Sequence, residues 1–387
     1  MANRVANIYS CAPIRRILAC GFVLWALASV AGCGSRTSLP VESDASSGAG
    51  AAGSTGTSSG SGSSGTSGGG GGATCNPDGA PCSSALPCCA EACVDGTCGV
   101  PACAKGEGAV ALASGLNWPF GVAVDETSVY FALYNSDGAV MKVPKAGGEV
   151  MTLKEGLDSP SQLALDDANL YVSVAGSGQV LKISKDGADV AVLASGQGGP
   201  SGLAIDATHV YWANYLGGSL VNVPKSGGPT ATLASELNPY RVGVGTTDLY
   251  WSGSSSGLRS VLKTGGPSIQ IASGNPRTMV SDGTSVYWTD PGDATVKRAD
   301  EDGGNPETLA ALEVDAFPDG IAVDELNVYW TVATGQVMKV AKTGGVPAVI
   351  ADGQNQPAIV AVDGSCVYWT NTSTTQREAG MVMRAPK

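Results

Sequence analysis

Histidine is the side chain most often used for proton transfer and metal binding near neutral pH, and it occurs once in this chain, as His209. His209 precedes Val210 and Tyr211, and we expect it in an exposed loop between two strands. A single imidazole excludes metal sites built from several histidines. We therefore predict no catalytic residue, no metal site and no cofactor, and an enzyme is the less favoured class.

An acidic residue that recurs about every forty positions is a second candidate for chemistry. Such carboxylates could form a ring around a central channel. Each one, however, ends an expected strand, where aspartate commonly accepts hydrogen bonds from turn amides. The pattern therefore favours a structural role, in which the carboxylate binds turn amides or the lysine of a later hairpin. The six aspartates are Asp125, Asp166, Asp206, Asp282, Asp324 and Asp363.

Eight residues that depart from the repeat pattern lie in segments that lead into a first strand or follow a second strand. Such loops vary most and commonly carry binding residues. Arg241 and Arg277 occupy near-equivalent positions in adjacent repeats and could clamp a carboxylate or phosphate group. Solvent-exposed arginines without a ligand are the alternative. The candidate ligand-binding residues are Trp118, Phe120, Gln162, Tyr215, Tyr240, Arg241, Arg277 and Asp319.

Seven repeats must position these side chains. Each repeat has a proline, an acidic residue six positions later and a tyrosine five positions beyond, as in Pro200, Asp206 and Tyr211; the fourth repeat has Gly245 at the acidic position. Successive prolines are 37 to 42 residues apart, a period typical of stacked supersecondary units. The prolines are Pro119, Pro160, Pro200, Pro239, Pro276, Pro318 and Pro357.

Each repeat contains four short runs of strand length separated by turn residues. In the third repeat these runs are 203–206, 210–214, 220–224 and 230–234, and glycines that allow a tight hairpin follow Lys225. Four antiparallel strands per repeat, arranged radially, form a β-propeller. We therefore predict an all-β fold with seven four-stranded antiparallel blades. Six blades with one degenerate unit is the alternative.

The two ends of the repeat array predict how the ring closes. Residues 381–387 form a third run with no fourth run after them, whereas residues 109–115 read like the fourth run of other repeats. We expect this N-terminal strand on the outer edge of the seventh blade. Such an exchange removes an unpaired strand edge.

The second strands carry a motif with a known relative. Residues Tyr287 to Asp290 spell YWTD, and close variants begin at Tyr211, Tyr250, Tyr329 and Tyr368. From about residue 109 to 387 the chain resembles the YWTD propellers of low-density-lipoprotein receptors and related bacterial propellers. The resemblance implies the propeller fold.

Two departures from that family limit what the resemblance implies. The receptor propellers have six blades, and here Phe131 and Val172 stand where the first two repeats would have tryptophan. Receptor ligand specificity is therefore not carried over to this chain. Regularly spaced Tyr and Trp residues on half-buried strands indicate packing between blades.

The N-terminal residues 1–32 resemble a bacterial lipoprotein signal peptide. Two arginines, Arg15 and Arg16, precede an apolar run that is too short to span a bilayer, and residues 30–33 resemble a lipobox ending at Cys33. The resemblance implies that Cys33 is lipidated and that the protein is anchored in the bacterial cell envelope, in the outer membrane because Gly34 follows. An ordinary signal peptide is the alternative. Residues 33–74 hold the lipidated cysteine and a Gly/Ser-rich flexible linker.

Six cysteines within residues 75–98 resemble the knottin framework, which makes residues 75–103 a small disulfide-rich segment. A zinc site is the alternative, but the segment contains no histidine. The resemblance implies three disulfides, and these join Cys75 to Cys89, Cys82 to Cys93, and Cys88 to Cys98.

Two cysteines remain in or near the propeller, which spans residues 104–387. Cys103 lies just before the closing strand, and Cys366 lies in the repeat that this strand should complete. We predict a disulfide between them at the seam of the ring. Closing so long a loop could contribute on the order of 4 to 5 kcal/mol in the chain-entropy model.

Charge limits the partners. Without Arg4, Arg15 and Arg16 of the signal peptide, 19 basic residues face 34 acidic ones, a net charge of −15. Nucleic acids are excluded by that balance. We expect a monomer, held to a membrane by its lipid, that binds a protein or small molecule at one propeller face without catalysis. A propeller-based hydrolase or lyase acting on an envelope or extracellular small molecule is the alternative.

Overall fold

The computed structural model describes residues 93–94, 97–98, 103, 106–235, 238–253, 257–373 and 379–387. Within these residues all regular elements are β-strands, and none is a helix that could cross a membrane. The predicted signal peptide, the predicted lipid attachment at Cys33, the predicted linker and the three predicted knottin disulfides lie outside the described residues. Upstream of the propeller, the backbones of β1 (Cys93–Val94) and β2 (Thr97–Cys98) pair antiparallel.

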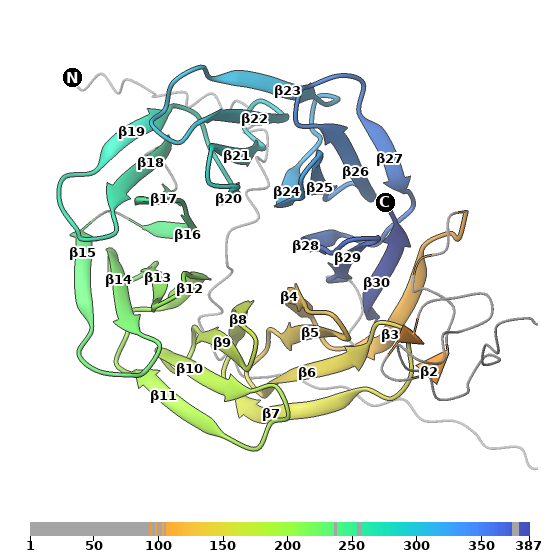
Figure 1. Cartoon of the computed structure of the whole chain (residues 1–387), viewed down its shortest axis with the longest axis horizontal. Coiled ribbons are helices and arrows are strands. Elements are labelled where there is room, and N and C mark those ends of the chain that lie inside the picture. Colours follow the sequence, from red (N-terminus) through yellow and green to blue (C-terminus); the bar gives the residue numbers. More distant parts are fainter. Residues whose placement is uncertain are drawn as a thin grey trace, which may run out of the picture. The chain divides into compact units, whose positions relative to one another are not determined.

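Seven four-stranded antiparallel sheets form a ring of blades in the described residues (Figure 1). Seven blades confirm the predicted fold, and the six-bladed alternative is wrong. In each blade the first strand lies nearest the centre and the fourth lies at the rim. The first strands are β4 (Pro119–Val124), β8 (Pro160–Leu165), β12 (Pro200–Ile205), β16 (Pro239–Val244), β20 (Met279–Ser281), β24 (Pro318–Val323) and β28 (Pro357–Val362). The second strands are β5 (Ser128–Leu133), β9 (Asn169–Val174), β13 (His209–Asn214), β17 (Asp248–Gly253), β21 (Ser285–Asp290), β25 (Asn327–Val332) and β29 (Cys366–Asn371).

The outer half of each blade follows the same order. The third strands are β6 (Gly138–Pro144), β10 (Gln179–Ser184), β14 (Ser219–Pro224), β18 (Gly257–Leu262), β22 (Thr295–Asp300), β26 (Gln336–Ala341) and β30 (Gly380–Pro386). The fourth strands are β7 (Met151–Leu157), β11 (Val190–Ala194), β15 (Ala231–Ser235), β19 (Ile269–Ala272), β23 (Glu307–Ala311), β27 (Ala348–Ala351) and, from the other end of the repeat array, β3 (Val110–Leu116).

The ring closes as predicted. The seventh blade has the order β28-β29-β30-β3, and Val110 and Ala111 of β3 face Arg384 and Met383 of β30. Cys103 and Cys366 form the predicted disulfide, with 5.7 Å between their Cα atoms and 263 residues between them in sequence. Both ends of the repeat array are therefore joined in one blade by hydrogen bonds and by a covalent bond.

Apolar cores lie between neighbouring blades, where the second strands supply their largest side chains. Tyr171 of one blade packs in the same core as Trp212 of the next, and both are at most 1% exposed. In the first and second blades Phe131 and Val172 take the tryptophan position, each fully buried and packed with Tyr368 and Tyr130 respectively. The regular tyrosines and tryptophans therefore pack between blades, as predicted, and do not form a ligand-stacking surface.

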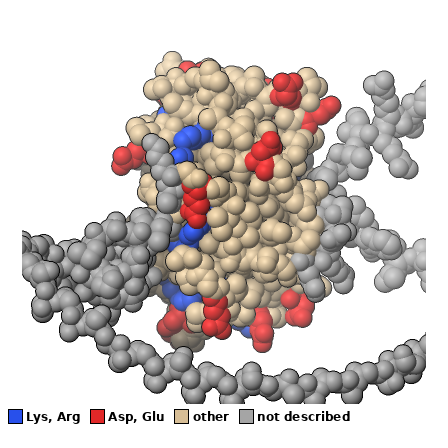
Figure 2. Space-filling view, turned by 90° about the vertical axis from the view of Figure 1, so that its right-hand side faces the viewer, with Lys and Arg blue, Asp and Glu red and all other residues tan. Residues whose placement is uncertain are grey.

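The part of the outer side that Figure 2 shows carries little concentrated charge. On the side shown in Figure 2 uncharged residues cover most of the surface, and the acidic and basic side chains lie in small groups. Charged residues make up only 14% of the whole chain. The side of the ring in this view therefore has no large patch of one charge.

Candidate ligand-binding site at the channel mouth

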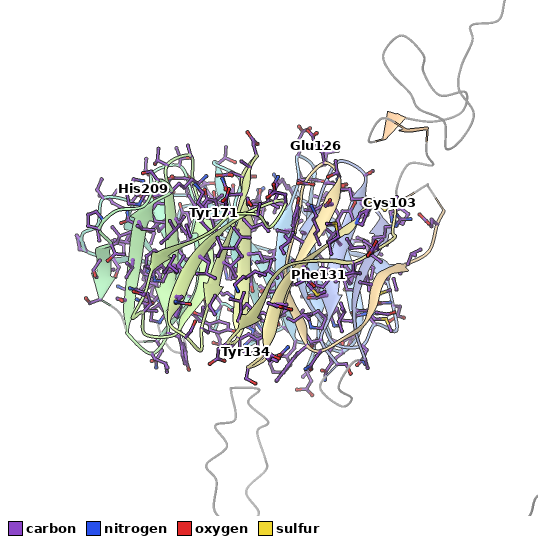
Figure 3. The ribbon with its side chains drawn as sticks, turned by 90° about the horizontal axis from the view of Figure 1, so that it is seen from below. Cys103, Glu126, Phe131, Tyr134, Tyr171 and His209 are labelled. Atoms are coloured by element: carbon purple, nitrogen blue, oxygen red, sulfur yellow. A yellow bond between two sulfur atoms is a disulfide. The ribbon has the colours of Figure 1, made fainter. Side chains whose placement is uncertain are left out.

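The propeller has two opposite faces, which differ in their loops. The hairpin face contains the loops between first and second strands and the hairpins between third and fourth strands; Glu126 and His209 lie on it (Figure 3). The mouth face contains the segments that lead into the first strands and the loops between second and third strands; Tyr134 lies there. Sequence reasoning places ligand binding on the mouth face.

The recurring aspartates of the hairpin face are structural. Asp125 Oδ1 accepts hydrogen bonds from the amides of Thr127 and Ser128 at 2.9 and 2.8 Å. Its Oδ2 accepts the Tyr130 hydroxyl at 2.9 Å and binds Lys185 Nζ at 2.8 Å. These interactions confirm the predicted role in binding turn amides and a hairpin lysine. The lysine, however, belongs to the next blade, so each aspartate links two blades.

Six such ion pairs run around the ring, with N–O distances between 2.6 and 3.4 Å. Burial raises the pKa of each aspartate carboxyl, but hydrogen bonds from lysine, tyrosine and turn amides outweigh it and hold the pKa well below its usual value. Burial and the same carboxylates raise the pKa of the tyrosine hydroxyls. The pairs are Asp125–Lys185, Asp166–Lys225, Asp206–Lys263, Asp282–Lys342, Asp324–Lys387 and Asp363–Lys145.

At the boundary between the fourth and fifth blades the acidic side chain comes from the later blade and not from the earlier one. The fourth blade has Gly245 in place of aspartate, and the next blade has Glu301 in place of lysine. Glu301 Oε1 accepts the Thr246 amide at 3.0 Å and the Ser281 hydroxyl at 2.5 Å. A Cβ atom on Gly245 would lie 2.5 Å from Glu301 Oε1. The glutamate of the fifth blade therefore occupies the space that an aspartate of the fourth blade would fill.

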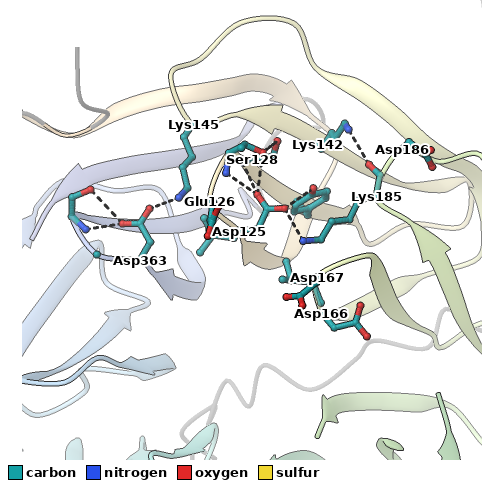
Figure 4. Close-up of a pocket in the computed structure, with 16 residues that line it drawn as sticks. Asp125, Glu126, Ser128, Lys142, Lys145, Asp166, Asp167, Lys185, Asp186 and Asp363 are labelled. Atoms are coloured by element: carbon teal, nitrogen blue, oxygen red, sulfur yellow. Dashed lines mark hydrogen bonds and ion pairs between the residues drawn. The ribbon is translucent and has the colours of Figure 1, made fainter. Parts of the chain in front are cut away.

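A groove of about 1200 Å³ crosses the hairpin face near the first blade (Figure 4). Its lysines have structural contacts: Lys145 pairs with Asp363, Lys185 pairs with Asp125, and Lys142 donates to the Lys185 carbonyl. The exposed carboxylates of Glu126, Asp167 and Asp186 also line the groove. In addition, no group of three His, Cys, Asp or Glu side chains in the described residues is arranged to hold a metal ion.

His209 also lies on the hairpin face and has structural contacts. Its amide donates to Asp206 Oδ1 at 2.8 Å, and its Nδ1 lies 2.8 Å from the Thr208 hydroxyl. The imidazole is partly exposed and packs beside the Tyr211 ring. The only histidine of the chain is therefore on the face opposite to the candidate site.

The mouth face brings the predicted candidates together. All eight, with Tyr134, form a connected set of contacts drawn from six blades, which we call the mouth cluster. The set comprises Trp118, Phe120, Tyr134, Gln162, Tyr215, Tyr240, Arg241, Arg277 and Asp319.

Arg241 is at the centre of the mouth cluster and is only 3% exposed. Its Nη1 donates to Gln162 Oε1 at 3.1 Å, and its guanidinium carbon lies 5.2 Å from the Phe120 ring centroid and 4.7 Å from that of Tyr240. Its Nε and Nη2 are buried without a hydrogen-bond partner. A close backbone contact helps to position it, because a Cβ atom on Gly202 would lie 2.6 Å from the Arg241 Cα.

Arg277 is engaged by a carboxylate. Its Nε binds Asp319 Oδ1 at 3.0 Å, and its guanidinium carbon lies 5.3 Å from the Tyr240 ring centroid. Tyr240 in turn packs edge-on against Tyr215 at 6.1 Å. The two arginines therefore share the Tyr240 ring but differ in charge pairing, because only Arg277 has an ion pair with an acidic side chain.

Trp118 and Tyr134 form the outer part of the mouth cluster. Their rings meet edge-on at 5.9 Å, and Trp118 is 44% exposed. The Trp118 backbone has a φ of 59°, and this left-handed conformation recurs before the first strand in four other blades, at Ser159, Gly199, Asn238 and Gln356. Burial raises the pKa of the Tyr134 hydroxyl to about 12, although the nearby Arg241 lowers it.

Sequence reasoning missed two residues of this site. Tyr134 lies four positions after Tyr130, as Tyr215 lies four positions after Tyr211, and this equivalence could have identified it. Thr278, which is also absent from the candidates, has a buried hydroxyl without a hydrogen-bond partner. No sequence signal distinguishes it from other hydroxyl residues of the repeats.

A cavity of about 320 Å³ lies in the centre of the ring beside the mouth cluster. First strands of all seven blades contribute to its wall, which includes Gln162, Arg241 and Thr278. Arg241 is the one charged residue in this wall; most of the others are aliphatic or glycine. The site is therefore an apolar chamber with a single cation, and its mouth is surrounded by aromatic rings.

Comparisons with known proteins place the chain by its fold. No protein-family model matches the sequence, and no curated protein matches it. Virginiamycin B lyase from Staphylococcus aureus is similar in structure, with a TM-score of 0.61, 11% identity, and coverage of 71% of this chain and 97% of the lyase. A streptogramin B lyase (TM-score 0.61, 12% identity, coverage 72% and 97%) and the WD40 propeller domain of Doa1 (0.59, 14%, 72% and 97%) are comparably similar. At these identities the similarity establishes the β-propeller fold.

Proposed function

We propose that this propeller is a non-catalytic binding module whose ligand docks on the mouth face. The observation that carries the proposal is the convergence of the mouth cluster, in which side chains from six blades contact one another, and the aromatic and cationic ones among them come from four blades. Such side chains supply large contact areas at binding surfaces.

The same features favour binding over a hydrolase or lyase. Catalysis at this face would need a general base directed at the ligand. The carboxylate of the mouth cluster, Asp319, already accepts a bond from Arg277, and His209 lies on the opposite face. The site thus offers recognition groups but no arrangement of nucleophile and base.

Ligand capture by the mature full-length protein tests this proposal. Immobilised wild-type protein is exposed to an envelope extract, and retained molecules are identified by mass spectrometry. We expect Trp118→Ala combined with Tyr240→Ala to lose the retained molecules. Glu126→Gln, on the opposite face, is the matched control and should retain them. Equal retention by the double variant and wild type would reject the mouth face as the binding site.

We further propose that Cys33 carries a lipid that holds the module at the outer membrane of a bacterium, with residues 33–74 as the tether. The support is the lipobox resemblance of residues 30–33. Forty linker residues would give a root-mean-square reach of about 35 Å. Cys33→Ala should release the protein from the membrane fraction and abolish incorporation of a fatty-acid analogue. Labelling that persists in this variant would refute the lipid attachment.

A further inference from the structure

The free edge of Arg241 is the least satisfied polar group of the mouth cluster. Its Nε and Nη2 are buried and have no hydrogen-bond partner, and its residue exposure is 3%. These two nitrogens lie on one edge of the planar guanidinium and form a fork that matches the two oxygens of a carboxylate. The opposite side is held in place, because Nη1 donates to Gln162.

The surroundings of Arg241 supply no counter-charge. No acidic residue contributes to the wall of the central cavity, and the one carboxylate of the mouth cluster, Asp319, binds Arg277. A buried cation without a partner is costly, and a second buried polar group, the Thr278 hydroxyl, also lacks a partner in this cavity. Both groups can donate hydrogen bonds, so each could be satisfied by an anion.

We propose that the central cavity binds a small organic carboxylate, whose two oxygens pair with Arg241 Nε and Nη2 and whose apolar body lies against the aliphatic wall. This inference rests on the proposed function and names its ligand class. The cavity volume of about 320 Å³ is at the lower end of the range for ligand cavities, which suits a short aliphatic or single-ring acid. A phosphate dianion fits less well, because one guanidinium would neutralise half its charge in an apolar chamber.

Access to the fork depends on the aromatic cover. Phe120 and Tyr240 stack near the guanidinium at 5.2 and 4.7 Å, and the two free nitrogens are not accessible to solvent. One of these rings must turn aside when the anion enters. Tyr240 also contacts Arg277 and Tyr215, so ligand binding and the outer mouth cluster are physically linked.

Titration calorimetry with hexanoate on the mature full-length protein tests the inference. We expect binding with a dissociation constant on the order of 100 µM. Hexan-1-ol keeps the apolar chain without the charge, and inorganic phosphate keeps the charge without the chain. Each should bind at least about tenfold more weakly, since a charge-assisted hydrogen bond accounts for about 10- to 100-fold in affinity.

Variants of Arg241 separate a ligand-binding arginine from a structural one. Arg241→Met should abolish hexanoate binding and, without ligand, raise the melting temperature by about 2 to 5 °C, because it removes an unpaired buried charge. Arg241→Lys keeps the charge without the fork and should bind about tenfold more weakly. Arg259→Met is the matched control: Arg259 packs on Trp251 in another part of the fourth blade. It should bind hexanoate like wild type.

Several outcomes would overturn the carboxylate assignment. They are absence of hexanoate binding to wild type, unchanged binding to Arg241→Met, and phosphate binding as tight as hexanoate binding. If Arg241→Met does not fold, hexanoate binding is measured with Arg241→Lys and Thr278→Val instead. An unchanged affinity for hexanoate in both variants refutes the assignment. If hexanoate fails while envelope capture still depends on Trp118 and Tyr240, only the ligand class is wrong. If both fail, the binding function is wrong as well.

Discussion

The inverted charge at the boundary of the fourth and fifth blades predicts a specific pattern of stability. At six other boundaries an aspartate meets a lysine of the next blade, whereas here Gly245 meets Glu301. We consider Gly245→Asp, Glu301→Lys and the double variant that restores the usual pair. Each single change should destabilise the protein, and the double change should recover part of the loss, because the contact of a new Cβ with the Tyr250 ring remains.

The magnitudes follow from the contacts. Glu301→Lys removes the acceptor of the Thr246 amide and the Ser281 hydroxyl, and it leaves an amine without its carboxylate. Two lost hydrogen bonds to a partly exposed charged group cost about 2 kcal/mol. Gly245→Asp places a Cβ 2.5 Å from Glu301 Oε1 and 2.6 Å from the Tyr250 ring, and it adds a second carboxylate, which together cost about 2 kcal/mol or more. In a propeller of this size each kcal/mol lowers the melting temperature by roughly 2 to 4 °C.

The double variant measures the coupling free energy between positions 245 and 301. The regular pairs have 13 to 21% exposed lysines and 15 to 29% exposed aspartates, which places their coupling between exposed and buried pairs, at about 1 to 2 kcal/mol. Melting temperatures of the four proteins, measured by calorimetry at pH 7, give the coupling. The Asp125–Lys185 pair, replaced singly and together by alanine, is the matched cycle. Additive losses in the Gly245–Glu301 cycle, with coupling below about 0.5 kcal/mol, would refute the idea that these positions exchange charge.

Two further predictions concern acid stability and the seam of the ring. The pKa of each ring aspartate is lower in the fold than in the unfolded chain, so its stabilisation is present above about pH 4 and is lost as pH falls towards the folded pKa. The melting temperature should therefore drop steeply below pH 4 and less steeply in Asp125→Asn, and equal slopes would contradict this. Replacing Cys103 and Cys366 together by alanine should remove up to about 4 to 5 kcal/mol, measured by denaturant unfolding, with Cys103→Ala alone giving a similar loss. A change below about 1 kcal/mol would show that strand β3 holds the seam by itself.

Local features of the sequence were enough to predict the architecture. The period of the repeat, the turn glycines and the alternation of residues in the second strands predict each blade separately. Seven similar blades avoid open ends of the array by forming a closed ring. The missing fourth run at the C-terminus and the spare run at residues 109–115 therefore predicted the closing strand. The same placement brought Cys103 near Cys366, and the structure contains that disulfide.

The structural role of the aspartates was predictable for the same reason. Asp125 accepts amides two and three positions away, which is a local turn interaction. Its lysine partner in the next blade was not predictable, because Lys185 is 60 residues away and approaches only when blades pack side by side. The carboxylate of Glu301 takes the place of the aspartate that Gly245 replaces, and this substitution likewise becomes visible only when the fourth and fifth blades pack together.

The candidate site shows where local information ends. The repeat pattern identified Arg241 and Gln162 as departures, but they are 79 residues apart, and only the ring directs both towards its centre. The contrast between Arg241, whose fork has no partner, and Arg277, bound by Asp319, depends on the orientation of each side chain in the closed ring. Turns and strand alternation are short-range features, so the blades could be predicted from the amino-acid sequence. The chemistry at the mouth could not, because it depends on closure of the ring, which brings side chains from six blades together.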